Sequence, residues 1–357
     1  MSERKSDQNP IKGRGSSDNP ANRFEEFYTD YDLDEETGQK PSRETRFYRD
    51  DTKEIISTND SPDIPFNKSV NPYRGCEHGC IYCYARPTHE YLGFSAGLDF
   101  ESRIMVKYEA PRKLRERLSS QTWKPEVLVM SGVTDPYQPA ERKLEITRGC
   151  LNVLAEFLNP VSVITKNHLV TRDIDYLKKL AEHDAARVTF SVTTLDRELA
   201  QKMEPRTSTP KRRLQAIKTL AEAGIPVGVN VAPIIPGLTD HESANILEAA
   251  AEAGATHAGY TILRLPHGVK DLFCDWLQQY FPDRREKVLN RIRDMRDGKL
   301  NDPRFGGRFR GQGNYARQIA DLFKLHAKRF GLNEGNRGLS TKSFRPGRGS
   351  QLGLFGN

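Results

Sequence analysis

The chain of 357 residues has no apolar run long enough to cross a lipid bilayer, and residues 1–10 lack the apolar core of a signal peptide. We therefore expect a cytoplasmic protein with no membrane segment. Cysteine is scarce, and an odd set of five suits a reducing compartment and a metal site better than a framework of disulfides. Hydrophobic residues reach only 36%, which indicates that part of the chain does not join a folded core.

Acidic residues are rare near the C-terminus. The whole chain has a net charge of +7, and residues 328–357 carry six lysines and arginines but only Glu334 as an acid, a net charge of +5. This excess favours an anionic partner, with nucleic acid as the first candidate class.

Strand and helix patterns alternate through the middle of the chain. Short β-branched runs predict strands at 67–70, 127–131, 161–165, 188–193, 227–231 and 257–263. Amphipathic runs predict helices between and after them, at 142–158, 173–182, 211–223, 242–253, 271–296 and 315–330. Six successive strand-helix units predict an α/β fold with a parallel sheet, either doubly wound or curled into an incomplete barrel, and hydrophobicity does not separate the two.

The flanking segments differ in composition from this core of residues 61–300. Residues 1–60 are polar and lack a sustained period, so they are predicted to form a largely disordered leader. Residues 301–330 are predicted to form a Gly/Arg loop and a last helix, and residues 331–357 a disordered basic tail.

The cysteines Cys76, Cys80 and Cys83 form a C-x3-C-x2-C run, which has one thiolate too few to close a tetrahedral metal site. An iron-sulfur cluster held by three cysteines keeps one iron open, and an open iron can bind and activate a small molecule. The alternative is a structural zinc site in which His89 or His78 is the fourth ligand. The run follows the first predicted strand, so it lies at the strand ends where barrel chemistry gathers.

This cysteine run, with the aromatic residue Tyr82 before the last cysteine, resembles the radical S-adenosylmethionine (SAM) superfamily. The resemblance implies a partial (β/α)6 TIM-type barrel and a 4Fe-4S cluster ligated by the three cysteines. It further implies that SAM binds the open iron and that an electron donor such as flavodoxin or ferredoxin drives its cleavage. The 5'-deoxyadenosyl radical so released would abstract hydrogen from a substrate, and Tyr82 would contact the adenine.

Within the superfamily, the segments 71–76, 131–137, 164–166 and 191–193 are most similar to the spore photoproduct lyase branch and its uncharacterised relatives. By this resemblance the segment after strand two takes the place of a Gly-Gly-Glu-like segment that contacts the methionyl amine of SAM. Residues at the ends of strands three and four would then hold the carboxylate and the ribose of SAM. An arginine after strand four could clamp the cofactor or a substrate phosphate, or else cap a helix. The cofactor-binding set implied in this way, beside Tyr82, is Ser131, Gly132, Thr134, Asp135, Lys166, Ser191 and Arg206.

One departure limits the resemblance. The lyase uses a cysteine near the end of strand two as its hydrogen donor, whereas this chain has Ser-Gly-Val at 131–133. The repair of thymine dimers is therefore not carried over, and the catalytic residues stay unassigned. Cys150 and Cys274 fall on amphipathic helices, where a buried thiol is the common case. Three tyrosines could relay a hydrogen atom or simply pack: Tyr73, Tyr84 and Tyr137.

The tail ends in a second short motif, in which Gln351, Leu352, Leu354 and Phe355 match the Gln-Leu-x-Leu-Phe peptide that docks bacterial DNA polymerases and repair proteins on the sliding clamp. A flexible tether would let these apolar side chains fill a groove of the clamp. The alternative is that they fold back on their own domain.

Together, these features favour a radical SAM enzyme that repairs or modifies DNA and binds the sliding clamp through its tail. A second hypothesis keeps the chemistry but assigns a protein or small-molecule substrate. A third is a zinc-stabilised nucleic-acid-binding module without catalysis.

Overall fold

The computed structural model describes residues 11–24, 44–335 and 338–346. A seven-stranded sheet is the centre of the molecule, with the strand order β10-β9-β8-β7-β6-β3-β2. Neighbours from β3 to β10 pair in parallel, and β2 joins the edge in the antiparallel direction. The strands are β2 (Ile56–Thr58), β3 (Lys68–Val70), β6 (Leu128–Met130), β7 (Val161–Thr165), β8 (Ala186–Val192), β9 (Val227–Ile234) and β10 (His257–Ile262). All six strands expected from the sequence are present.

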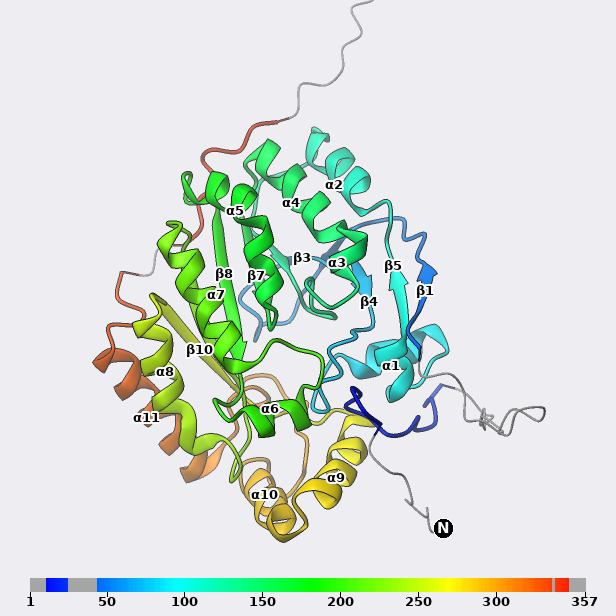
Figure 1. Cartoon of the computed structure of the whole chain (residues 1–357), viewed down its shortest axis with the longest axis vertical. Helices are drawn as coiled ribbons and strands as arrows, with labels where there is room; N and C mark the ends of the chain where they lie inside the picture. Colours follow the sequence, from blue (N-terminus) through cyan, green and yellow to red (C-terminus); the bar gives the residue numbers. More distant parts are fainter. Residues whose placement is uncertain (1–10, 25–43, 336–337, 347–357) are drawn as a thin grey trace, which may run out of the picture.

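Helices between the parallel strands cover the outside of this sheet (Figure 1). They are α2 (Ala110–Ser119), α3 (Glu141–Leu144), α4 (Ile146–Phe157), α5 (Ile174–Ala181), α7 (Pro210–Glu222) and α8 (Ser243–Glu252). The short helix α6 (Arg197–Met203) lies instead against the cysteine loop, where the Met203 carbonyl accepts from the Ile81 N–H at 3.0 Å. The central strand β8 is buried on both faces, since Phe190 and Ser191, which are successive residues and so face opposite sides, are both buried, as expected for a covered parallel sheet. The predicted partial (β/α)6 TIM-type barrel is confirmed.

A small second sheet, which the sequence did not predict, supports the cysteine loop. It has the order β1-β5-β4, with β1 (Arg46–Arg49), β5 (Arg103–Val106) and β4 (Tyr73–Arg74). A 3-10 helix, η1 (Arg86–Leu92), and α1 (Leu98–Ser102) lie between β4 and β5 in the chain. These elements are too short to show a hydrophobic period.

The C-terminal part differs from the sequence prediction at one helix. The run 271–296 is two helices, α9 (Val269–Tyr280) and α10 (Pro282–Asp294). Pro282 has no N–H for the helix ladder, and Phe281 leaves helical geometry with φ −143°. The last helix is α11 (Gly313–Arg329). Before it, the loop 301–312 reaches both edges of the sheet: the Phe309 carbonyl accepts from the Ile262 N–H at 2.8 Å, and Arg308 pairs with Asp63 at 2.8 Å.

The described parts of the leader and tail lie against the barrel, while residues 1–10, 25–43, 336–337 and 347–357 are outside the described ranges. Residues 46–49 and 56–58 are strands, and residues 11–24 contact the segment after the cysteines. In the tail, the Arg345 N–H donates to the Phe157 carbonyl at 2.7 Å, and Phe344 stacks on Phe157 at 6.3 Å between centroids. Backbone hydrogen bonds hold these segments, and composition does not reveal such bonds. The peptide 351–355 lies outside the described residues. Among the described helices, none combines the length and apolarity needed to span a bilayer.

Candidate active site

The three cysteines lie in one loop that begins directly after β4. The Cys76 N–H donates to the Phe100 carbonyl at 2.8 Å, and the Cys83 N–H donates to the Cys80 carbonyl at 3.2 Å. Gly79 has φ +67°, in the left-handed region that glycine occupies readily, so the chain can turn sharply between the first two cysteines. Cys76 and Cys80 are buried and Cys83 is half-buried.

The thiols share a poorly hydrated site. Burial, followed by the nearby Glu204 carboxylate, raises the pKa of Cys80 well above its usual range. Burial and the neighbouring Cys76 also raise the pKa of Cys83. A thiolate is the form that ligates metal, and bound cations would offset the cost of placing three negative charges together. Three thiols in one enclosed loop are a donor set that fits an iron-sulfur cluster.

Both histidines considered as zinc ligands contact other groups, although the buried Nδ1 of His89 has no hydrogen-bond partner among the described residues. His78 Nδ1 lies 3.3 Å from Asp135, and its Nε2 lies 3.2 Å from the amide of Asn167. His89 Nε2 contacts the Arg103 carbonyl at 2.9 Å. Within the described ranges, no three His, Cys, Asp or Glu side chains converge as ligands of a single ion must.

The segment after β6 fastens the cysteine loop. Thr134 donates to the Gly75 carbonyl at 2.6 Å, and Gln138 accepts from the Glu77 N–H at 2.9 Å. Gly132, with φ +125°, turns the chain here, and its carbonyl accepts from Tyr84 at 2.9 Å. The Ser131 hydroxyl lies 3.4 Å from the Thr134 carbonyl. The predicted residues 131–135 are thus brought to the cysteines.

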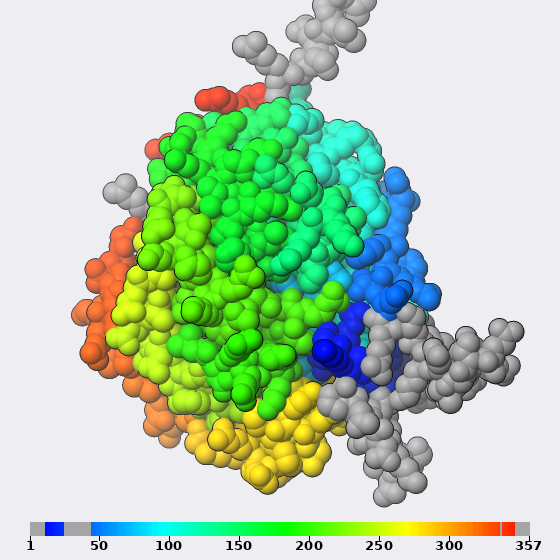
Figure 2. Space-filling model, viewed as in Figure 1, coloured from blue at the N-terminus to red at the C-terminus, as the bar shows by residue number. Residues whose placement is uncertain are grey.

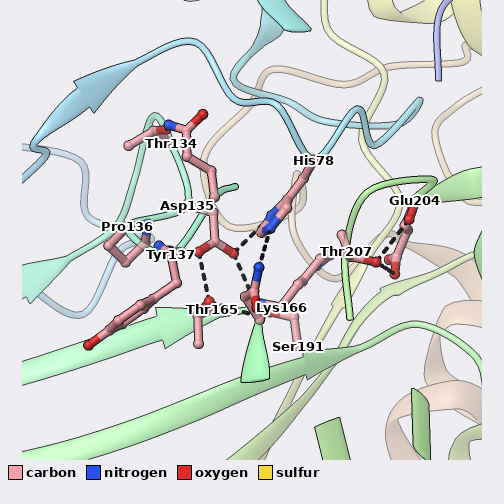
Figure 3. A network of polar contacts seen from close by, with 12 residues as sticks. His78, Thr134, Asp135, Pro136, Tyr137, Thr165, Lys166, Ser191, Glu204 and Thr207 are labelled. Atoms are coloured by element: carbon pink, nitrogen blue, oxygen red, sulfur yellow. Dashed lines mark hydrogen bonds and ion pairs between the residues drawn. The ribbon is translucent and has the colours of Figure 1, made fainter. Parts of the chain in front are cut away.

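Asp135 is the centre of a polar network (Figure 3). Its carboxylate accepts from the Thr165 hydroxyl at 2.7 Å and from the Lys166 N–H at 2.8 Å. Burial alone would raise the pKa of Asp135, but His78 and these hydrogen bonds bring it below the usual value. Since both oxygens accept protein donors, Asp135 joins β7 to the cysteine loop, and contact with a cofactor stays a prediction for it.

Lys166 follows β7 and extends its ammonium group toward the cysteines. Its Nζ lies 3.4 Å from the Ala232 carbonyl and 5.8 Å from the centroid of the Tyr82 ring. Burial lowers the pKa of Lys166, while the nearby Cys80 and Cys83 act in the opposite direction. The Lys166 side chain is therefore placed beside two of the thiols.

Tyr82 is held by residues that the sequence analysis did not select. Its hydroxyl donates to Glu204 and lies 3.0 Å from the Thr193 hydroxyl. Arg213, fully buried, donates to Glu204 and, at 2.9 Å, to the carbonyl of Ser191. In the sequence, Glu204 stands two residues before Arg206, the residue of this segment that was selected as a candidate. Arg213 lies in a predicted amphipathic helix. No sequence signal therefore identified this buried ion pair.

Arg206 lies at the site and contacts the cysteine loop itself. Its guanidinium pairs with Glu77 at 3.0 Å, and its N–H donates to the His78 carbonyl at 3.2 Å. The group expected to clamp a cofactor or phosphate thus holds the cysteine loop. Ser191 is buried near the end of β8. Ligand contacts of both residues stay predictions.

Comparisons with known proteins agree with this geometry. Residues 70–250 match the model of the radical SAM superfamily. An uncharacterised protein of Mycobacterium tuberculosis is 36% identical over 234 residues, which are 65% of this chain and 68% of that protein. An uncharacterised protein of Methanocaldococcus jannaschii is 31% identical over 173 residues, 48% of this chain and 62% of that protein. Among solved structures, spore photoproduct lyase complexed with dinucleoside spore photoproduct aligns with a TM-score of 0.56 at 17% identity, over 80% of each chain.

The chain belongs to the radical SAM superfamily. It is a radical SAM enzyme whose cofactors are a 4Fe-4S cluster and SAM, and the likeness to the lyase concerns the fold. Cys76, Cys80 and Cys83 are the residues that would hold the cluster. When bound, the cluster supplies the electron that cleaves SAM to give a hydrogen-abstracting radical.

Proposed function

We propose that the substrate of this enzyme is nucleic acid, which it repairs or modifies by hydrogen abstraction. The observation that carries this proposal is a group of arginines and aromatic rings beside the cysteine loop, here called the mouth patch. Its members are Tyr84, Arg264, Phe305, Arg308 and Phe309.

The mouth patch is a continuous series of ring and guanidinium contacts. Tyr84 directly follows the last cysteine, and the Arg264 guanidinium lies 6.0 Å from its ring centroid and 4.7 Å from that of Phe309. The Arg308 guanidinium lies 5.0 Å from the Phe309 ring and 4.7 Å from the Phe305 ring. Tyr84 is 51% exposed and Phe305 is 62% exposed. Two large rings are thus open to solvent, and one of them, Tyr84, adjoins the last cysteine.

Such a surface suits unpaired nucleobases. Bases stack on exposed aromatic rings and on guanidinium planes, while positive charge attracts the phosphates. The buried Nε of Arg264 has no hydrogen-bond partner among the described residues, so it is a donor that a phosphate or base oxygen could satisfy. The net charge of +7 acts in the same direction. The structurally similar lyase was solved with a dinucleoside, which further supports the proposal.

Within this function we assign Lys166 to the methionyl carboxylate of SAM. Its ammonium group already lies beside Cys80 and Cys83, where the open iron would bind the amino acid part of the cofactor. A charge-assisted hydrogen bond to a carboxylate is the contact that a lysine at this place can make. Tyr82, held by Glu204 and Thr193, presents its ring in the same region for the adenine.

Two partners complete the proposal. The enzyme works in the cytoplasm, where flavodoxin or ferredoxin would deliver the electron. The Gln351 to Phe355 peptide would bind the sliding clamp and so concentrate the enzyme on DNA, since a tethered second contact raises the effective concentration.

The direct test is an anaerobic assay of the cluster-loaded protein with dithionite, SAM and deuterated single-stranded or duplex DNA. We expect deuterium to appear in 5'-deoxyadenosine. SAM cleavage without transfer of label from any DNA or RNA would contradict the proposed substrate and favour a protein or small molecule.

Binding of a fluorescent single-stranded oligonucleotide tests the mouth patch itself. Loss of one stacking ring removes about 1–3 kcal/mol, so Phe305→Ala should weaken Kd about tenfold. Tyr108, an exposed tyrosine before α2, is the matched control, and Tyr108→Ala should leave Kd unchanged. Equal affinity of both variants would remove the patch from the proposal.

A further inference from the structure

Residues 11–24, here called the strap, lie across the segment that contains the cysteine loop (dark blue in Figures 1 and 2). The N–H groups of Gly15 and Ser16 donate to the carboxylate of Glu101 at 3.0 and 2.8 Å. Glu101 is fully buried and also accepts from Arg86 at 2.5 Å, and Arg86 donates to the Cys80 carbonyl at 3.0 Å. One continuous path of hydrogen bonds therefore joins the strap to the backbone of a cluster cysteine.

The strap also touches the cysteine loop directly. A Cβ atom added to Gly15 would stand 1.6 Å from the carbonyl oxygen of Gly79, far inside any allowed contact. Gly79 lies between Cys76 and Cys80, so backbone packs on backbone at the turn that separates these two ligands. A second close approach follows, since a Cβ on Gly97 would stand 2.0 Å from the Asp18 carbonyl oxygen. Only glycine at these positions lets the two segments meet.

Polar side chains continue the attachment. Asn19 and Asp99 exchange two hydrogen bonds, at 2.9 and 3.2 Å. Asn22, which is buried, donates to the Glu90 carbonyl at 2.9 Å. The strap therefore binds at three successive places along the segment that follows the cysteines.

We propose that the strap fixes the cysteine loop in its cluster-binding conformation and thereby determines how firmly the cluster is held. Gly15, Ser16 and Glu101 are positioning residues, because they act through Gly79 and Arg86. Since coupling between two binding events is reciprocal, the bound cluster must in turn stabilise the docked strap. This inference does not depend on the identity of the substrate.

The first experiment measures iron release from anaerobic, cluster-loaded full-length protein to a chelator. Gly15→Ala forces the strap away from Gly79 and from Glu101. We expect release about tenfold faster than from the unchanged chain, the factor that corresponds to losing one hydrogen bond to a charged group. The matched control is Gly338→Ala, because nothing lies within 4 Å of the added Cβ and the neighbouring Ser340 N–H is bonded to the Asp184 carbonyl after α5. Equal release rates for both variants would overturn the proposal.

A second variant covers the case in which Gly15→Ala does not fold. Asn19→Ala combined with Asn22→Ala loosens the strap without a clash, and iron release should again accelerate while the far-UV circular dichroism is unchanged. The reciprocal experiment follows trypsin cleavage after Arg14 and Arg23 in the unchanged chain. Removal of the cluster should speed this cleavage several-fold, and an unchanged rate would also overturn the proposal.

Discussion

The buried pair of Arg213 and Glu204 permits the most quantitative prediction. Arg213 donates to Glu204, to the Ser208 carbonyl at 2.8 Å and to the Ser191 carbonyl at 2.9 Å, and both charged side chains are almost completely buried. Arg213→Met removes these donors and leaves the Glu204 carboxylate uncompensated. Removing one partner of a buried pair costs about 3–5 kcal/mol, and we expect a loss of this size in the free energy of unfolding.

Urea unfolding of the reduced cluster-free protein, followed by circular dichroism, measures this loss. Arg212→Met is the matched control, since Arg212 is the preceding residue of α7 and is exposed. Adding Glu204→Gln to Arg213→Met should recover part of the loss, because the stranded charge is then removed. A change below about 1 kcal/mol, equal to that of Arg212→Met, would refute the importance of this pair for the site.

Three further predictions concern pH, cofactor and partner. Burial lowers the pKa of His257 to about 4 in the folded state, whereas the unfolded chain binds a proton at this histidine near pH 6.5. Lowering the pH from about 6.5 to about 4 should therefore reduce the free energy of unfolding by up to about 3 kcal/mol. His257→Gln should flatten this part of the stability profile while the exposed His241→Gln should not, and identical profiles would contradict the assignment. Lys166→Met should weaken SAM binding at least about tenfold in equilibrium dialysis, with Lys166→Arg milder, whereas unchanged affinity would exclude the carboxylate contact. Leu354→Ala with Phe355→Ala should abolish pull-down of the sliding clamp without affecting SAM cleavage, and retained pull-down would discard the docking peptide.

The parallel sheet could be predicted from the sequence because its strands read as short β-branched runs separated by amphipathic helices. Val161 to Thr165 is the clearest case, with identical predicted and observed bounds. The small sheet of β1, β4 and β5 could not be predicted. β4 has two residues, and β1 leaves Arg46 and Phe47 exposed, so neither carries the alternation that identifies a strand.

The cysteine ligands could be predicted because the spacing of the three cysteines is typical of a loop that binds an iron-sulfur cluster. The groups that organise them were not, since they depend on long-range contacts: Glu101 is bonded by a strap more than 80 residues earlier, and Tyr82 by Glu204, 122 residues later. Glycines illustrate the same limit. In the sequence, Gly15 is a glycine in a polar segment with no distinguishing feature. Only its close approach to Gly79 in the structure shows why a side chain is excluded at this position.

The central claim is that three cysteines hold a cluster with one open iron. Mössbauer spectroscopy of anaerobically reconstituted protein, recorded before and after addition of SAM, tests it most directly. The account predicts about four irons per chain and a change at only one iron site when SAM binds, with loss of the cluster in Cys83→Ala. Stoichiometric zinc in place of iron, or a four-iron spectrum that SAM leaves unaltered, would contradict it.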